Sequence, residues 1–272
     1  MLTLSWFGTT TVPVEAECIR PDLLTGKSNS EIERLLVQHG NRQRPLAEFF
    51  RVSGDAVDQC ITIEGDVRRV KWIGADMSRG QILIDGDVGT HLGSAMSGGR
   101  ITVKGNAGDW VGGEMRGGLI QIHGNAGHQT GAAYRGSRRG MRGGTILIHG
   151  SSGNEIGGTM RRGLIAVAGD AGDFAGVSMI AGTIILGRSL GQRAGAGMKR
   201  GTIAALRPGD ALHLLPTFRF DCEYGPVFLE LYRRQLEGLG FPWPTASAHR
   251  NFLRFSGDLV ALGRGEILAA SS

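Results

Sequence analysis

Aliphatic residues recur in pairs two positions apart along the middle of the chain, and each pair stands between glycines. The unit G-x-[IVL]-x-[IVL]-x-G-x-x-G-x-x-x-G-x-x-M-x-x begins at Gly80, Gly99, Gly118, Gly144, Gly163 and Gly182. A looser first copy runs from Ile61 to Gly80. A spacing of two is the strand period, whereas helical pairs would fall three or four apart. The pattern therefore predicts about seven copies of a unit that contains one strand and several turns.

The interval between copies is constant apart from one insertion. Successive units begin 19, 19, 26, 19 and 19 residues apart, and the long interval holds seven extra residues from Tyr134 to Gly140. A fixed period of this size is typical of a solenoid, in which each repeat buries its apolar edge only against its neighbours. We therefore expect an all-β fold, a parallel β-helix (solenoid) of about seven coils.

The glycines mark the expected corners, where left-handed backbone is cheapest without a Cβ. The residue after the second corner glycine is usually Asp or Asn, which suits a turn; these residues are Asp66, Asp87, Asn106, Asn125 and Asp170. In the last copy Arg188 replaces this corner glycine, so a distorted turn is expected there. No proline occurs between Pro45 and Pro208, as a body of paired strands requires. The β-helix is therefore placed at residues 59–206.

Every methionine except Met1 occupies one position of the repeat. They are Met77, Met96, Met115, Met141, Met160, Met179 and Met198. Such a column could bind copper(I) through its thioethers, but no Cys or His accompanies it. We therefore expect the column to fill the inside of a narrow coil. Seven coils at strand spacing would form a rod about 35 Å long.

The two ends of such a rod would be open sheet edges and need covering. Residues 1–58 contain a predicted helix from Asn29 to His39, capped by Asn29 or Ser30, and form an N-terminal cap or partner-binding segment. Residues 207–272 contain a helix-like stretch, VFLELYRRQLEGL, followed by an extended tail. We expect these mixed α/β segments to close the two ends or to bind a partner.

The bulk composition excludes several classes of protein. Hydrophobic residues make up 41% and charged residues 20%, which is ordinary for a globular protein. The three cysteines, Cys18, Cys60 and Cys222, are too far apart in sequence for a zinc or iron–sulfur pattern. The first residues lack a basic leader, and no apolar run approaches the roughly 18 residues of a membrane span. We expect a reduced, cytoplasmic protein without a membrane partner.

The sequence offers no catalytic constellation. It contains no G-x-S-x-G elbow, Walker loop or H-E-x-x-H, and the glycines do not open a helix after a strand. His123 and His149 share one repeat position and should lie close together, but no third ligand joins them. We expect a surface pair there, with no catalytic residue and no metal site.

Basic residues gather at one position of the repeat. The two places after each methionine hold seven basic residues and no acid: Arg79, Arg116, Arg142, Arg161, Arg162, Lys199 and Arg200. The insertion adds Arg135, Arg138 and Arg139. Because one position repeats in every coil, these charges should line one edge of the rod, which we name the basic edge.

The basic edge has two interpretations. It is either a solvated face that prevents aggregation or a track for an acidic subunit or polyanionic ligand. Nucleic acid is disfavoured, because no aromatic residues are interleaved with these arginines for base stacking. The candidate binding residues are Arg135, Arg138, Arg139, Arg161 and Arg162.

Several segments together resemble one family. They are GNAGDWVGGEMRGGLIQIHGNAGHQTGAAYRGSRRGMRGG at 105–144, GDVRRVKWIGADMSRG at 65–80, VPVEAECIRPD at 12–22 and GDLVALGRGEI at 257–267. This set is similar to the C subunit of formylmethanofuran dehydrogenase, in particular to the C subunit of the bacterial formyltransferase/hydrolase complex. The coil motif alone is also similar to the β-helix domain of the large subunit of glutamate synthase.

The resemblance implies a right-handed β-helix without catalytic residues, which joins an amidohydrolase-like subunit to a formyltransferase subunit. Such a complex moves a formyl group from tetrahydromethanopterin to a methanofuran analogue and releases formate, in the oxidation of formaldehyde. The polyglutamate tail of methanofuran-type cofactors is a candidate ligand for the five arginines.

Three alternatives stay open at this point. The first is the C subunit of an archaeal tungsten or molybdenum formylmethanofuran dehydrogenase. The second is a glutamate-synthase-like spacer domain, which would predict fusion to an amidotransferase. The third is an enzyme in its own right, since some coiled repeat proteins are acyltransferases. Those use a hexapeptide period and a catalytic His, and a 19-residue period argues against them.

Overall fold

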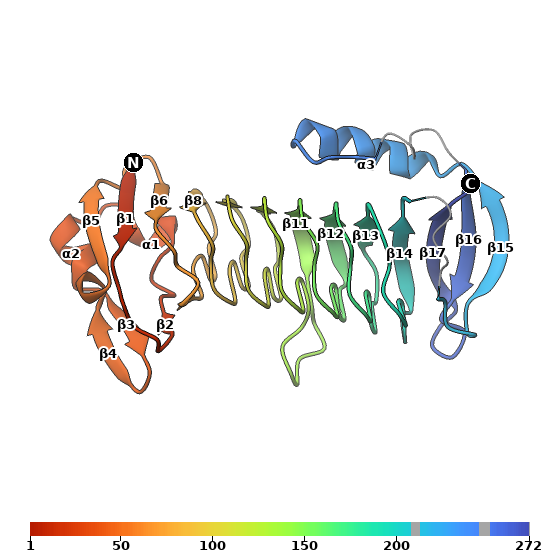
Figure 1. The fold of residues 1–272 in the computed structure, drawn as a ribbon, viewed down its shortest axis with the longest axis horizontal. Helices are drawn as coiled ribbons and strands as arrows, with labels where there is room; N and C mark the ends of the chain where they lie inside the picture. The colour runs from red at the N-terminus through yellow and green to blue at the C-terminus, as the bar shows by residue number, and fades with distance from the viewer. Residues whose placement is uncertain (208–212, 245–250, 272) are drawn as a thin grey trace.

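The computed structural model describes residues 1–207, 213–244 and 251–271, and its long axis follows the repeat (Figure 1). In this part of the chain the repeat forms one large, mostly parallel sheet. Its repeat strands are β6 (Cys60–Glu64), β8 (Gln81–Asp85), β9 (Arg100–Val103), β10 (Leu119–Ile122), β11 (Arg142–Ile148), β12 (Arg162–Val167), β13 (Thr183–Leu186) and β14 (Arg200–Ala205). The seven predicted strands are confirmed, and β14 adds another.

Strands lie in register at the spacing of the repeat. Ile101 stands opposite Ile82 on one side and opposite Ile120 on the other, and all three are buried. The predicted inward methionines are confirmed, because each of the seven has 0% of its surface exposed. The alternating pattern therefore arises because every second side chain of each strand points into the core.

The backbone of each repeat meets its neighbours again after the strand. Isolated parallel bridges join equivalent residues in consecutive copies: Val67, Val88, Ala107, Ala126, Ser152, Ala171 and Leu190. The seventh copy keeps its register on both sides of Arg188, since Ala171 bridges to Leu190 and Leu186 pairs with Ala205. The distortion expected at Arg188 is absent from this pairing.

The corner glycines serve two different purposes. Gly99 precedes its strand with a φ of +80°, the left-handed conformation that was predicted. Gly105 follows the strand and is not left-handed; a Cβ there would lie 2.3 Å from Oδ1 of Asp87 and 2.7 Å from the carbonyl oxygen of Gly86. In this copy the second corner leaves no room for a Cβ because the preceding copy approaches closely, whereas the seventh copy carries Arg188 at the equivalent position.

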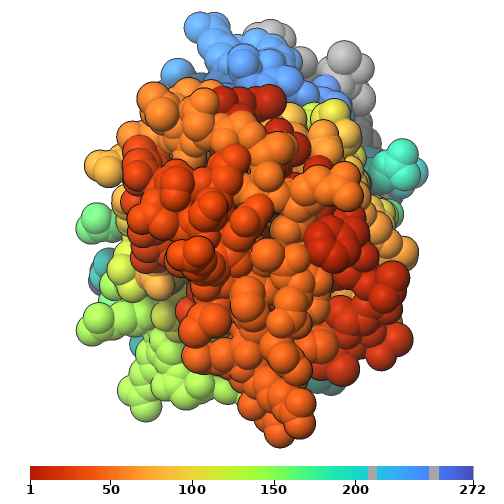
Figure 2. Space-filling model, turned by 90° about the vertical axis from the view of Figure 1, so that its left-hand side faces the viewer, coloured from red at the N-terminus to blue at the C-terminus, as the bar shows by residue number. Residues whose placement is uncertain are grey.

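The N-terminal region continues the sheet and covers its end. It contains β1 (Leu2–Trp6), β2 (Val14–Glu15), α1 (Pro21–Leu24), α2 (Asn29–Glu33), β3 (Leu36–His39), β4 (Arg42–Pro45), the 3-10 helix η1 (Leu46–Glu48) and β5 (Phe50–Gly54). Strand β1 pairs with β6 in parallel and with β5 in antiparallel fashion. A four-stranded sheet, β4-β3-β2-β7, includes β7 (Val70–Lys71) of the first copy. Figure 2 shows this region, in red and orange, over the end of the molecule.

The predicted helix from Asn29 to His39 is wrong in its second half, and its predicted cap, Asn29 or Ser30, is also wrong. The helix α2 begins after Ser28, whose side chain accepts from the backbone N–H of Glu31 while the Glu31 carboxylate accepts from the backbone N–H of Ser28. It ends at Glu33, and β3 then pairs with β2. Strand β3 also pairs with β4, the next strand in sequence. Pairing with both strands therefore outweighs the local helical pattern.

The C-terminal region adds three strands and a helix beyond β14. They are β15 (Arg219–Tyr224), α3 (Val227–Gly238), β16 (Phe252–Gly257) and β17 (Arg264–Ala270). Strand β17 pairs with β14 in parallel, and β16 and β15 follow in antiparallel order. The predicted C-terminal helix is confirmed as α3. It and the insertion project from opposite sides of the body (Figure 1).

Candidate functional site

The five candidate arginines are all exposed and fall into two groups. Arg161 and Arg162 stand at the start of β12, and Arg162 is its first residue. Arg135, Arg138 and Arg139 belong to the insertion, whose last residue, Gly140, donates its N–H to the carbonyl oxygen of Thr159 over 3.2 Å. The insertion therefore rejoins the body two residues before Arg161.

Two pairs of arginines lie side by side on neighbouring strands of the sheet. Arg142 and Arg162, both of the basic edge, pair across β11 and β12 at a register shift. Arg200 pairs with Arg264, which lies on β17 outside the repeat and was missed in the sequence. The guanidinium Nε of Arg142 is buried and has no hydrogen-bond partner among the described residues. Within the same ranges, neither Arg161 nor Arg162 forms an ion pair.

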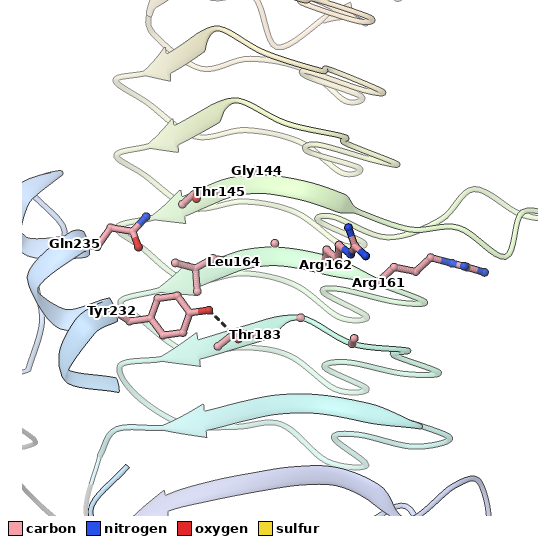
Figure 3. A pocket seen from close by; sticks show the side chains of 11 residues that line it. Gly144, Thr145, Arg161, Arg162, Leu164, Thr183, Tyr232 and Gln235 are labelled. Atoms are coloured by element: carbon pink, nitrogen blue, oxygen red, sulfur yellow. Dashed lines mark hydrogen bonds between the residues drawn. The ribbon is translucent and has the colours of Figure 1, made fainter. Parts of the chain in front are cut away.

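A groove of about 400 Å³ lies between α3 and the outer face of the sheet. Arg161 and Arg162 lie at the end of the groove where β12 begins, and Tyr232 and Gln235 of α3 line the opposite side (Figure 3). The Arg161 side chain points away from α3 (Figure 3). The Tyr232 hydroxyl lies 3.3 Å from Oγ1 of Thr183 on the floor. The groove thus combines neutral hydrogen-bonding groups along its length with two arginines at its end, a set of residues that suits a carboxylate or another anion.

The groove exists because α3 packs against the outer face of the sheet. Leu229 and Leu236 of the helix are buried in one cluster with Leu164, Ile185 and Ala204. A second hollow of about 480 Å³ shares its floor and wall with the groove and adds apolar and acidic side chains, Phe228, Leu231 and Glu266. The sequence predicted the helix but not its contact with the sheet, so the groove was missed.

Charged side chains on the exposed surface of α3 pair with each other. Arg233 donates to Glu230 over 2.6 Å and to Glu237 over 2.6 Å, and Arg234 also reaches Glu230. The hydrogen bonds from Arg233 lower the pKa of Glu230 to about 2, with a further contribution from Arg234. Arg233 and Arg234 are therefore ion-paired within the helix, unlike Arg161 and Arg162 of the groove.

Four aromatic rings form a stack that sequence reasoning missed. Trp72 stacks on His91 at 4.2 Å between ring centroids, His91 on Trp110 at 6.0 Å, and Trp110 on Tyr134 of the insertion at 4.7 Å. Trp72, His91 and Trp110 follow one another at intervals of 19 residues, so they occupy one position of the repeat. This spacing could have predicted that the three rings stack. Each has a φ between 62° and 66°, a conformation that bulky residues rarely adopt.

His123 and His149 lie side by side as predicted, with ring centroids 4.7 Å apart. His149 is nevertheless half-buried, because Phe241 packs edge-on against it at 5.8 Å. Gln121 lies 3.0 Å from Nε2 of His149 and donates to the carbonyl oxygen of Leu239. His149 and Gln121 therefore contact the segment that follows α3.

Reactive and metal-binding groups are sparse among the described residues. That part of the chain contains no group of three or more His, Cys, Asp or Glu placed to hold a metal ion. Burial raises the pKa of the Cys18 thiol to about 11, so it is not a thiolate at neutral pH. No helix in the described ranges is long and apolar enough to cross a membrane.

The fold and the basic edge define an elongated, mostly β repeat protein whose exposed chemistry suits anion binding. Similarity to known proteins places it more closely. A chain in the crystal structure of the formyltransferase/hydrolase complex (FhcABCD) from Methylorubrum extorquens, in complex with methylofuran, is 36% identical. It superimposes with a TM-score of 0.89 over 98% of both chains. No family model matches the chain.

Curated archaeal relatives match a shorter segment. The C subunit of the molybdenum-containing formylmethanofuran dehydrogenase 1 from Methanothermobacter thermautotrophicus is 52% identical over 83 residues. Those residues are 30% of this chain and 21% of the relative. The C subunit of the tungsten-containing enzyme 2 of that organism is 44% identical over 86 residues, 30% of this chain and 32% of the relative. The chain belongs to the family of formylmethanofuran dehydrogenase C subunits.

Proposed function

We propose that the chain is a non-catalytic structural subunit of a formyltransferase/hydrolase complex in tetrahydromethanopterin- and methanofuran-linked one-carbon metabolism, which oxidises formaldehyde to formate. One observation carries this proposal: the match to a chain of the Methylorubrum complex extends over 98% of both chains. A match of that extent includes both terminal regions, which are the parts most free to differ between proteins that share only a repeat.

The proposed partners are an amidohydrolase-like subunit and a formyltransferase subunit of the same complex, in the cytoplasm. The proposed cofactor is a methanofuran-type, polyglutamylated molecule that the complex handles, while this chain binds no cofactor for catalysis. The bound methylofuran of the Methylorubrum complex supports the choice of cofactor. An archaeal formylmethanofuran dehydrogenase is the second candidate, favoured by the 52% identity over 83 residues.

For the architecture we propose a right-handed parallel β-helix at residues 59–206. An N-terminal cap or partner-binding segment would occupy 1–58 and a C-terminal helical and extended tail 207–272, so that mixed α/β caps close both ends. The in-register sheet together with the bridges between consecutive copies supports coils that close on themselves. The pairing of β1 with β6 and of β17 with β14 supports caps that continue the sheet.

We propose that Arg135, Arg138, Arg139, Arg161 and Arg162 bind an acidic partner surface or the anionic tail of the cofactor. Their exposure, the groove beside Arg161 and Arg162, and the absence of ion pairs for these two within the described ranges support this role. Arginine suits it because the guanidinium fork matches a carboxylate in two hydrogen bonds.

The test is purification of the native assembly through a tag on this chain. Formyltransferase and amidohydrolase subunits should co-elute in fixed ratio, and the eluate should release formate from a formylated pterin donor. A tagged, unrelated β-solenoid expressed in the same host is the control. If the chain elutes alone, or with an amidotransferase, the proposed function is wrong.

A further inference from the structure

Tyr134 is the first residue of the insertion and is half-buried on the body of the molecule. Its ring lies nearly parallel to that of Trp110, with 17° between the planes, and 5.8 Å from that of Trp72. The ring therefore covers side chains of copies that precede its own in the chain. An aromatic stack of this kind contributes beyond the area that it buries.

The Tyr134 hydroxyl joins two polar groups of one earlier copy. It lies 2.5 Å from Oγ of Ser94 and 3.0 Å from Nδ1 of His91. Ser94 is only 2% exposed, so Tyr134 satisfies a buried hydroxyl that water cannot reach easily. Burial raises the pKa of Tyr134 to about 12, so the phenol keeps its proton and can donate at neutral pH.

Gly113 provides the space in which the ring lies. A Cβ on this residue would stand 2.9 Å from the Tyr134 hydroxyl oxygen and 3.1 Å from Cζ. Gly113 is not left-handed, so an alanine there would strain no backbone and would only push the ring away. At the same repeat position the adjacent copies carry Ser94 and Ala132.

The rest of the insertion is also ordered by hydrogen bonds. The backbone N–H of Tyr134 donates to Oε1 of Glu114 over 3.3 Å, and that of Ser137 donates to the Tyr134 carbonyl oxygen over 2.9 Å. The backbone N–H of Arg139 donates to Oγ of Ser137 over 3.2 Å. The insertion is thus tied at its first residue by Tyr134 and at its last by Gly140, with its arginines exposed between.

We propose that Tyr134 is a positioning residue that holds the insertion as a preformed docking element for an acidic polypeptide segment of a partner subunit. Three exposed arginines within five residues give the element its preference for acid, and this part rests on the proposed function of the basic edge. A loop that is ordered before binding loses less conformational entropy on association, so preorganisation raises its affinity.

Two substitutions in the full-length chain test the position of the ring by different routes. Tyr134→Phe removes both hydrogen bonds and keeps the ring, and Gly113→Ala fills the space under it. Tyr224→Phe on β15 is the matched control. Limited trypsin digestion, followed by mass spectrometry, gives the rate of cleavage after Arg135, Arg138 and Arg139, and titration with poly-L-glutamate gives the binding of an acidic chain.

Both variants should be cleaved about two- to tenfold faster at these three sites, the effect of losing one or two net hydrogen bonds. Both should bind poly-L-glutamate more weakly, while Tyr224→Phe matches the native chain. Unchanged cleavage overturns the proposal. Suppose that replacing the three arginines by glutamine abolishes the binding of poly-L-glutamate. Faster cleavage of the Tyr134→Phe and Gly113→Ala variants with unchanged binding would then also overturn the proposal. If that triple variant also binds normally, the docking role fails together with the insertion's part of the basic edge, although Tyr134 still orders the insertion.

Discussion

The backbone N–H of Asn106 donates to Oδ1 of Asp87, one repeat earlier, over 2.7 Å. Asn106 in turn accepts through its own Oδ1 from the backbone N–H of Asn125 over 2.8 Å. The same relationship continues along the body through Ser151, Asp170 and Ser189. A second column repeats it from Asp109 through His128, Asn154 and Asp173 to Gln192. Short polar side chains at the turns therefore join consecutive copies, beyond shaping their own turn.

Replacing Asn106 by Ala should break this column at its second residue. The substitution leaves the backbone N–H of Asn125 without its acceptor. It also removes the hydrogen bond that the side-chain amide of Asn106 donates to Asp87. Each net hydrogen bond is worth about 1 kcal/mol, so the free energy of unfolding should fall by about 1 to 2 kcal/mol in urea titrations. Lys104→Ala is the control, since its pair with Asp85 is exposed and should change stability by less than about 1 kcal/mol. Equal effects would show that the column does not stabilise the fold.

Met115 tests the packed interior. Its side chain is fully buried, and its methyl carbon Cε lies 2.7 Å from where a Cβ on Gly144 would be. Met115→Asp should prevent folding, because an unpaired buried carboxylate costs several kcal/mol. Met115→Leu conserves volume and should cost less than about 1.5 kcal/mol. Circular dichroism melting of both variants gives the comparison, and an aspartate variant with the native melting temperature would contradict the buried column.

The sequence carries most of the information about the body and little about the ends. Strands could be predicted because each repeat encodes its own alternation and finds an identical neighbour, as at Ile101 and Ile120. In the segment from Asn29 to His39, the local pattern marks where the helix begins. It does not mark where the helix ends, because that depends on the pairing of β3 with β4 and with β2.

The candidate site was predictable only where it follows the period. Arg142 and Arg162 each follow a methionine of the repeat, at the first and the second place respectively, and a register shift between β11 and β12 brings them side by side. Tyr134 belongs to the insertion, which follows no period, and its contacts with Ser94 and His91 require that the insertion fold back over earlier copies. The groove depends on α3 reaching the sheet, and an amphipathic helix does not specify which surface it will cover.

His149 should make the stability of the chain depend on pH. Burial, and next the neighbouring His123, lower the pKa of His149 in the folded chain. The unfolded chain then binds a proton more readily, so stability is full above about pH 6.5 and is lost as pH falls through the lowered pKa. His149→Asn should reduce the loss of melting temperature between pH 7.5 and pH 5. The same loss in the variant would assign the effect to other groups.

The isolated chain should not transfer or hydrolyse a formyl group. The described residues bring together no nucleophile and base, and Cys18 is a protonated thiol at neutral pH. Purified chain without partners should therefore give no formate above the rate of buffer in a coupled assay. The assembled complex serves as the positive control, and turnover by the chain alone would contradict a purely structural role.

The basic edge should act as two separable groups of arginines. Arg161 and Arg162 line the groove beside α3, whereas Arg135, Arg138 and Arg139 are carried by the insertion. An exposed pair contributes about 0.2 to 1 kcal/mol, so single substitutions should do little and each group must be changed together to Gln. Both variants should keep the native melting temperature, because none of the five side chains is buried.

If both groups contact the same acidic partner or cofactor tail, the quintuple variant should lose about the sum of the two effects in binding free energy, most visibly at low salt. The measurement is retention of partner subunits and of bound cofactor after affinity purification at low and physiological salt. Arg219→Gln together with Arg234→Gln, outside the edge, matches the net charge of the variant in which Arg161 and Arg162 are changed. Unchanged composition, cofactor content and formate output in the quintuple variant would leave the edge as a solvated face.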